Sequence, residues 1–285
     1  MIEIESIHDL RRLVHGERAA GRRVAFVPTM GSLHEGHLRL VDEARRRAEA
    51  VVMSVFVNPL QFGPGEDLAR YPRDLPRDRA LARARGVDVL FTPAEDVMYP
   101  PGSQIRVTPG PAAARWEGAA RPGHFEGVLT VVAKLFNLVD PEVACFGRKD
   151  IQQATLVRQM VRDLDWPIEI VVVPTAREPD GLALSSRNAY LDADLRRRAV
   201  VLSAALQAAH EAFRVGERQA AALQATVRRT LATEPAAEVE YVAVAEPLTL
   251  APIETAGADT VVALAARLGP TRLIDNIILG EGLDG

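Results

Sequence analysis

Two histidines three residues apart, His34 and His37, follow a short apolar run and a turn that contains proline and glycine. The run Val24–Val27 has the character of a buried strand, and apolar residues recur at helical spacing from Leu38 to about Ala50. A strand, a tight turn and a helix therefore place both imidazoles at the helix start. Unpaired N–H groups and a partial positive charge make a helix start an anion site. The same charge favours neutral imidazoles that donate to phosphate oxygens.

A metal site is the alternative for such a pair. Zinc proteases carry histidines at i and i+4 with glutamate beside the first. Glu35 fits that pattern, but His37 comes one residue too early. Gly31 and Gly36 leave space for a nucleotide to approach the backbone. The segment from Met30 to His37 therefore predicts a phosphate site, and we expect no metal ligands from the protein.

The composition limits the class of protein. The chain has 285 residues, a net charge of −4 and one cysteine, Cys145. The charge gives no indication of a nucleic-acid or anionic membrane partner, and a lone cysteine fits a reducing compartment. The sequence also lacks an apolar stretch of membrane length and a signal peptide. We therefore expect a cytoplasmic protein.

Strands alternate with helices as far as Pro174, which predicts an α/β domain with a doubly wound, parallel, Rossmann-like sheet over residues 1–175. After that, three alternating segments accompany two helical ones, which predicts a smaller α+β domain with a small antiparallel sheet over residues 176–285. Ligands of such parallel sheets bind beyond the carboxyl ends of the strands. The expected strands are 2–4, 51–57, 87–91, 105–107, 143–146, 168–173, 239–244, 260–267 and 271–279, and the expected helices are 7–20, 38–50, 67–84, 127–138, 151–164, 192–213 and 219–233.

Polar side chains follow three further expected strands. Lys149, one of only two lysines among 34 basic residues, comes after the expected strand 143–146, where an ammonium is suited to stabilise phosphate charge. The hydroxyls and guanidinium of Ser185–Arg187 suit a polyphosphate. Asn58 and Gln61 are uncharged amides that bond hydroxyls and carboxylates.

Each of these groups has a structural alternative. Asp150 beside Lys149 is suited to cap a helix. Polar residues are common in exposed loops, and Asn58 lies beside a proline in a turn. We expect Cys145 in the core, Arg196–Arg198 on a solvated helix face, and His124 as a weaker site candidate.

Taken together, the motifs resemble a known family. Pro28–His37 resembles the HIGH-type signature of a nucleotidyl-transfer superfamily, and Leu184–Arg187 resembles its KMSKS-like loop. Within that superfamily the chain resembles the pantoate–β-alanine ligase family, in order from residue 24 to about 192. The motifs are Pro28-Thr29-Met30-Gly31, Phe56–Phe62, Arg70-Tyr71-Pro72-Arg73, His124-Phe125-x-Gly127-Val128, Lys149-Asp150-x-Gln152-Gln153 and Ser185-Ser186-Arg187-Asn188.

The resemblance implies an AMP-forming carboxylate–amine ligase that makes pantothenate, AMP and pyrophosphate from ATP, pantoate and β-alanine, on the route to coenzyme A. The pantoate carboxylate attacks the α-phosphorus to form a bound pantoyl adenylate, and the amine of β-alanine then attacks the activated carbonyl. The resemblance also implies magnesium bound with the ATP phosphates, a C-terminal lid domain, and a homodimer formed through the N-terminal domains.

Carried over by position, the resemblance implies the site residues. ATP would be bound by Met30, Gly31, Ser32, Leu33, His34, Glu35, Gly36, His37, Gly147, Arg148, Lys149, Asp150, Ala176, Leu184, Ser185, Ser186 and Arg187. Pantoate would be bound by Gln61 and Gln153, β-alanine by Gln61, and Asn58 would support that pocket. His37 is implied as proton donor, with His34 and Lys149 as further catalytic residues. Since a carboxylate nucleophile is already ionised, we expect the three to stabilise phosphate charge.

Two positions depart from the family pattern: Arg148 stands where an acidic residue is common, and Leu184 stands where methionine is common. Two rival functions stay open. A nucleotidyltransferase acting on a phosphorylated acceptor would need basic residues where Asn58, Gln61 and Gln153 stand. A nucleotide-binding regulator would bind ATP without turnover.

Overall fold

The structure, a computed structural model, describes residues 1–283, which divide into two compact units. The first unit comprises Met1–Gly147 and Leu156–Val173. The second comprises Arg148–Thr155 and the chain from Pro174 onward. A short segment between two parts of the first unit therefore belongs to the second. The assignment of domains to residues 1–175 and 176–285 stays a prediction.

A six-stranded parallel sheet forms the centre of the first unit, in the order β1-β4-β3-β2-β5-β6. The predicted doubly wound α/β sheet is confirmed. The chain passes from β2 outward to β3 and β4 and then returns to the other side of β2, so the topological switch point lies between β2 and β5. The strands are β1 (Ile2–Ile4), β2 (Val24–Thr29), β3 (Ala50–Val55), β4 (Val89–Phe91), β5 (Val143–Gly147) and β6 (Glu169–Val173).

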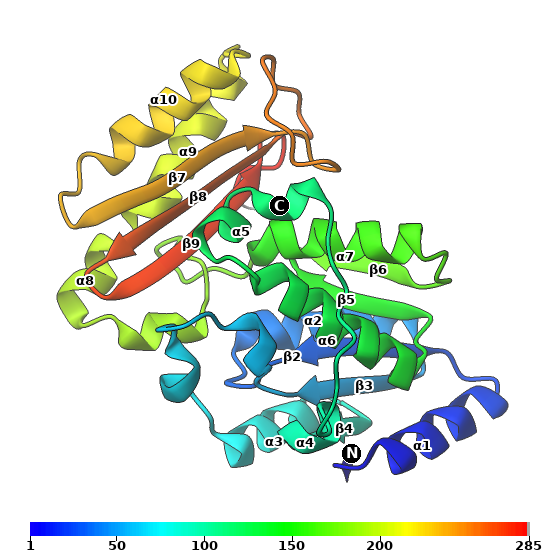
Figure 1. Ribbon diagram of the computed structural model, residues 1–285. Coiled ribbons are helices and arrows are strands. Elements are labelled where there is room, and N and C mark those ends of the chain that lie inside the picture. Colours follow the sequence, from blue (N-terminus) through cyan, green and yellow to red (C-terminus); the bar gives the residue numbers. More distant parts are fainter. Residues whose placement is uncertain (284–285) are drawn as a thin grey trace. The chain divides into compact units, whose positions relative to one another are not determined.

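Helices cover both faces of this sheet, because successive side chains of a strand point to opposite sides. Ala25 and Val27 of β2 pack with Val41 of α2, whereas Phe26 meets Phe136 of α6 with ring centroids 6.4 Å apart. Figure 1 shows α6 in front of the sheet and α2 behind it. The helices are α1 (Ile7–Ala19), α2 (Glu35–Arg47), α3 (Leu75–Ala84), α4 (Glu95–Met98), α5 (Glu117–Ala120), α6 (His124–Val139) and α7 (Ile151–Asp163), of which α7 begins in the second unit.

The second unit contains the antiparallel sheet β7-β8-β9, as the sequence predicted. Helices α9 and α10 pack against each other and against the strands, around a buried cluster that includes Leu206, Leu223 and Leu264. Two short 3-10 turns, η4 (Arg148–Asp150) and η5 (Ser186–Tyr190), contact the edge strand β9. The elements are β7 (Ala237–Ala245), β8 (Val261–Leu268), β9 (Thr271–Ile278), α8 (Ala193–Arg198), α9 (Val201–Arg214) and α10 (Ala220–Leu231).

One predicted strand is wrong. Residues 105–107 alternate in character, but they form no strand. Ile105 is 87% exposed, and the N–H of Val107 donates to the hydroxyl of Thr130 on α6 at 2.9 Å. A strand needs backbone hydrogen bonds to a neighbouring strand, but the backbone of this segment bonds to a helix side chain instead. Alternation of residue types alone does not provide a neighbouring strand.

Four predicted helices have different limits. Helix α6 begins at His124, three residues before the expected start at Gly127. Helix α2 starts at Glu35, before Leu38, because the histidine turn caps it, and it ends at Arg47. The expected helix over 67–84 is a 3-10 turn, η2 (Asp67–Arg70), followed by α3, which begins after its N-cap Asp74. The expected helix over 192–213 is interrupted between α8 and α9.

Cys145 lies in the core, as predicted. It is fully buried on β5, and burial raises the pKa of its thiol to about 12. Arg196–Arg198 lie on α8 and form ion pairs with Asp180, Asp194 and Glu234. Among residues 1–283, no helix has both the length and the apolar character needed to cross a membrane.

Candidate active site

The turn between β2 and α2 carries the histidine pair. β2 ends at Thr29, whose hydroxyl donates to the carbonyl of Ser54 at 2.7 Å and accepts from the N–H of Gly31 at 3.2 Å. Gly31 has φ +82°, in the left-handed region that favours glycine, and the chain turns there. His34 follows as the N-cap of α2, and His37 is the third residue of the helix. The predicted strand, turn and helix are confirmed.

The two imidazoles hold this turn by reciprocal hydrogen bonds. Nδ1 of His34 accepts from the N–H of Gly36 at 3.1 Å, and Nδ1 of His37 accepts from the N–H of His34 at 3.3 Å. The ring centroids are 4.1 Å apart. A ring that accepts through Nδ1 is neutral, since imidazolium has donors only, and its proton is on Nε2. The geometry therefore describes two neutral imidazoles, each with an Nε2–H group.

A buried carboxylate that the sequence analysis missed fixes the same turn. Asp78 of α3 is 1% exposed and accepts from the N–H of Ser32 at 2.8 Å and of Leu33 at 2.7 Å. Burial raises the pKa of Asp78, although both backbone bonds oppose the shift. The neighbouring Arg77 donates to the carbonyl of Leu33 at 3.0 Å. Asp78 thus holds two consecutive amides of the predicted phosphate turn.

Gly31 packs closely against two side chains at the position where other residues carry a Cβ. A Cβ at this position would come within 2.9 Å of Oδ2 of Asp78 and of Cγ1 of Val55. That space is filled by protein, so the lack of a side chain here allows the turn to pack against Asp78 and Val55. The helical spacing of Asp78 could have indicated its burial, because Asp78 and Ala82 lie on one buried face of α3.

The predicted substrate amides lie together in the first unit. Asn58 is the N-cap of the 3-10 turn η1 (Pro59–Gln61), and its Nδ2 donates to Oε1 of Gln61 at 3.1 Å. Nε2 of Gln61 reaches Sδ of Met30 at 3.0 Å. Both amides are buried, at 1% and 9% exposure. The structure thus brings Asn58 and Gln61 to the first residue of the histidine turn.

Two further residues of this unit hold the amides in place. The hydroxyl of Tyr99 donates to Oδ1 of Asn58 at 2.9 Å, and Nδ2 of Asn58 also donates to the carbonyl of Gly127 at 3.1 Å. A Cβ on Gly127 would lie 2.1 Å from the carbonyl oxygen of Leu60, so only glycine allows this approach. Tyr99 carried no sequence signal, because it lies in an irregular segment 41 residues from Asn58.

His124 supports the backbone of the same pocket. Its Nδ1 is 2.8 Å from the carbonyl oxygen of Gln61, and its Nε2 is 3.1 Å from a guanidinium nitrogen of Arg121. Burial and the charge of Arg121 lower the pKa of His124 to about 4. The ring is therefore neutral at pH 7, donating through Nδ1 and accepting through Nε2. Arg121 also pairs with Glu66, at 2.5 Å.

The predicted lysine turn lies in the second unit. Lys149 is the middle residue of η4, directly before α7, and its Nζ is 3.9 Å from Oδ1 of Asp150. Arg148 is buried and forms an ion pair with Glu281 of the same unit. The added positive charge at this position is therefore paired within the protein.

The predicted serine–arginine loop follows a short hairpin. The N–H of Leu184 donates to the carbonyl of Ala176 at 2.8 Å, and a β-bridge joins Arg177 to Ala183. Oγ of Ser185 then accepts from the N–H of Arg187 at 3.2 Å and caps η5. The resemblance assigns both Ala176 and Leu184 to ATP, and this backbone hydrogen bond joins them across the hairpin.

The predicted site residues form two sets. Met30–His37, Asn58 and Gln61 are brought together in the first unit, where Gly147 is the last residue of β5. The second unit contains the rest, namely Arg148, Lys149, Asp150, Gln153, Ala176, Leu184, Ser185, Ser186 and Arg187. Their assembly around one nucleotide is part of the proposal below.

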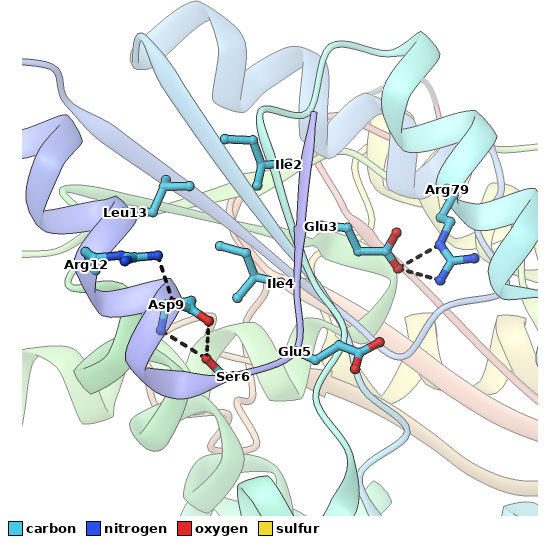
Figure 2. Close-up of a pocket in the computed structure, with 9 residues that line it drawn as sticks. All are labelled: Ile2, Glu3, Ile4, Glu5, Ser6, Asp9, Arg12, Leu13 and Arg79. Carbon is cyan, nitrogen blue, oxygen red and sulfur yellow. Dashed lines mark hydrogen bonds and ion pairs between the residues drawn. The ribbon is translucent and has the colours of Figure 1, made fainter.

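A cavity of about 850 Å³ beside β1 contains none of these residues. Figure 2 shows two ion pairs among its charged side chains, Arg79 with Glu3 and Arg12 with Asp9, beside the carboxylate of Glu5. Within the described range, no group of three or more His, Cys, Asp or Glu side chains is arranged to hold a metal ion.

Comparisons with known sequences match one family along almost the whole chain. The model of the family described as pantoate-beta-alanine ligase matches residues 3–278. The pantothenate synthetase of Chloroflexus aurantiacus is 57% identical over 267 residues, which cover 93% of this chain and 95% of that protein. That of Pelotomaculum thermopropionicum is 49% identical over 281 residues, covering 99% and 100%.

Solved structures agree as well. The crystal structure of pantothenate synthetase from Thermus thermophilus matches with a TM-score of 0.94 and 51% identity, covering 98% of this chain and 99% of the other. The pantoate–β-alanine ligase of Francisella tularensis, in complex with β,γ-ATP and β-alanine, matches with a TM-score of 0.80 and 33% identity over both full chains. The enzyme class that the motifs implied is confirmed. This chain belongs to the pantoate–β-alanine ligase family.

Proposed function

We propose that this chain joins pantoate to β-alanine in two steps, using ATP, through a bound pantoyl adenylate. Family membership supports the reaction, and the capped histidine pair is the observation that carries the assignment of its ATP site. In the first step a pantoate carboxylate oxygen bonds to the α-phosphorus and pyrophosphate leaves. In the second step the amine of β-alanine bonds to the acyl carbon, the acyl carbon–oxygen bond breaks, and AMP leaves as the amine loses a proton.

The ATP phosphates bind to the turns that precede α2 and α7. The Nε2–H groups of His34 and His37 point to phosphate recognition, because both Nδ1 atoms are already used as acceptors. Lys149 adds an ammonium that stabilises the charge developing on the leaving pyrophosphate. The two turns follow neighbouring strands, since β2 pairs with β5, and this supports their action on one nucleotide.

Further ATP contacts come from residues that follow these turns. Ala176, Leu184, Ser185, Ser186 and Arg187 bind the adenosine and polyphosphate from the hairpin and the loop after it. The backbone N–H of Ala176 and the hydroxyls of the two serines are suited to hydrogen bonding, and the guanidinium of Arg187 to a phosphate.

Pantoate binds against Gln61 and Gln153, with Asn58 holding Gln61 in place and Gln61 also reaching β-alanine. Buried, neutral amides suit a substrate that carries hydroxyls and one carboxylate. The neutral state of His124 adds no positive charge to this pocket. A phosphorylated acceptor would need a cation where these amides stand.

Three finer assignments complete the proposal. Magnesium enters with the ATP phosphates, as is usual for an ion that proteins bind through one or two carboxylates and substrate phosphates. Two copies of the chain associate through their first units, and the enzyme acts in the cytoplasm. The second unit serves as the lid over the nucleotide.

Oxygen transfer gives the sharpest test. Pantoate labelled with ¹⁸O in its carboxylate is incubated with the purified protein, ATP, magnesium and β-alanine. Because the carboxylate oxygen that attacks phosphorus stays with AMP when the amide forms, one labelled oxygen is expected in AMP and one in pantothenate. Omission of pantoate should abolish the release of pyrophosphate.

Other outcomes would identify the rivals. Pyrophosphate release that requires a phosphorylated acceptor and leaves AMP joined to it would indicate the nucleotidyltransferase. ATP binding without turnover would indicate the regulator. Unlabelled AMP with pantothenate formed would contradict the adenylate route.

A further inference from the structure

Two adjacent side chains of β9, Asp275 and Asn276, are buried in the second unit, each 2% exposed. Neither carries a role in the proposed reaction. β9 contacts both η4, which contains Lys149, and η5, which follows Ser185. The strand thus lies against both ATP-binding segments of its own unit.

Asn276 bonds directly to the lysine turn. Its Nδ2 donates to the carbonyl of Arg148 at 2.9 Å and to the carbonyl of Lys149 at 2.9 Å. Oδ1 of Asn276 has no hydrogen-bond partner in the described structure, so the donor half of the amide makes the contact. A neutral planar group with two donors suits two consecutive carbonyls. The peptides on either side of the Lys149 Cα are therefore fixed by one side chain.

Asp275 bonds to the hairpin through the side chain of Arg177. Its carboxylate accepts from both terminal nitrogens of Arg177, at 2.7 and 3.0 Å, and the two side chains are 1% and 10% exposed. Arg177 also donates to the carbonyl of Gly181 at 3.1 Å, across the hairpin. The pair therefore fixes the segment that carries Ala176 and Leu184.

Stability alone is a weak reason for such an arrangement. A buried ion pair loses much solvation, and well-packed apolar side chains of similar volume often replace it without loss of stability. A bidentate pair instead provides a defined geometry. The bonds of Asp275 and Asn276 end on the two segments assigned to ATP.

We propose that Asp275 and Asn276 are positioning residues that fix the lysine turn and the 176–184 hairpin relative to each other for ATP. The inference rests on the proposed function, because that proposal assigns the two segments to ATP. Neither residue touches substrate. Their effect reaches the reaction through the position of Lys149 and the shape of the hairpin.

The first test is Asn276→Ala, with Leu273→Ala as the matched control on the same strand. Leu273 belongs to the buried cluster and contacts neither segment through a side-chain hydrogen bond. We expect Asn276→Ala to lower kcat for pantoate-dependent pyrophosphate release by about 10- to 100-fold, as small misplacements of catalytic groups do. The KM for pantoate should change less than kcat, because Asn58 and Gln61 belong to the other unit and only Gln153 of the assigned pantoate residues follows the lysine turn. Leu273→Ala should lower Tm and keep kcat.

The second test removes the ion pair as a unit. Asp275→Leu or Arg177→Met alone leaves a buried charge and should lower Tm strongly. The double variant Arg177→Met/Asp275→Leu should regain most of the lost Tm, yet bind ATP about tenfold more weakly, because the hairpin must be ordered on binding. ATP affinity is measured by calorimetry without pantoate, so this arm does not depend on the ligase reaction.

The outcomes separate the two proposals. Wild-type kcat in folded Asn276→Ala, or an equal fall in kcat in Leu273→Ala at equal loss of Tm, would overturn the positioning role while the ligase activity stands. Wild-type ATP affinity in the folded double variant would overturn it for Asp275. A wild-type protein that binds ATP but needs no pantoate for turnover would overturn the proposed function, and the calorimetric arm would still decide the positioning role.

Discussion

The turn before α2 and the turn before α7 both follow a strand of the parallel sheet, but different parts of the chain fix them. In the first turn, side chains of Thr29, His34 and His37 bond to amides within three residues of themselves. In the second turn, Asn276 bonds to carbonyls 127 and 128 residues away. The first turn is largely fixed by its own sequence, and the second depends on the fold of its whole unit.

This difference decides what a substitution does. A change in the histidine turn alters its local structure and also the phosphate donors of the proposed reaction, because the proposal assigns both purposes to the same rings. A change of Lys149 removes a charge and leaves the bonds to Asn276, which use backbone carbonyls. The following experiments test that separation, beginning with the largest effect.

Lys149→Ala should raise the barrier to adenylate formation by about 2–4 kcal/mol, comparable to the loss of one preorganised donor. Its Tm should stay near that of wild type, because the backbone bonds of the turn remain. Single-turnover pyrophosphate release measures the effect, with Arg197→Ala on the exposed face of α8 as control. A loss of less than about tenfold would count against the role of Lys149.

Acidification should loosen the pocket around Gln61, because His124 bonds to the carbonyl of Gln61 from 63 residues away. This test needs no substitution. The pKa of His124 is lowered in the folded protein to about 4 from 6.5. Its contribution to stability is therefore complete above pH 6.5 and is lost as the pH falls towards 4, by up to about 3 kcal/mol. Denaturant unfolding between pH 7.5 and 4.5 measures it. His124→Asn should show a shallower dependence, and an identical slope would refute the assignment.

Asp78→Asn tests the distant carboxylate that bonds to two amides of the histidine turn. The amide can accept from only one of the two N–H groups, Ser32 or Leu33, and it turns a donor towards the other. Since relief of the burial penalty offsets part of this loss, we expect a cost of about 1–2 kcal/mol in the free energy of unfolding. Adenylate formation should slow as well. Asp42→Asn, which breaks a partly exposed pair with Arg85, is the control; equal stability loss in both would argue against a special role of Asp78.

His34→Ala separates capping from chemistry. Loss of the N-cap should cost about 1 kcal/mol of stability and also slow adenylate formation. His34→Asn restores a good N-cap residue without restoring the imidazole. We expect Asn to recover the Tm and leave the rate low; recovery of both would mean that His34 acts only as a cap.

The same contrast explains how far the sequence could be interpreted. The parallel sheet and the antiparallel sheet were predictable because buried strands and helical spacing are local patterns. The histidine turn was predictable for the same reason, since its residues bond to one another. The false strand at residues 105–107 had the right alternation but no neighbour with which to pair.

Contacts between distant segments were not predictable in this way. Asp78 lies 45 and 46 residues from the amides that it binds, and Tyr99 lies 41 residues from Asn58. A single sequence contains no mark that joins such positions. The motifs identified the residues assigned to the substrates, whereas the residues that hold them became visible only in the structure.

The buried thiol of Cys145 makes this protein convenient for labelling. Because the chain has one cysteine and burial keeps it un-ionised near neutral pH, reagents that attack thiolates should leave the wild-type background unmodified. An exposed position in each unit, such as Arg39→Cys and Arg197→Cys, can then accept a pair of spin labels or dyes. Such a doubly labelled protein allows the separation of the two units to be measured in solution during a catalytic cycle.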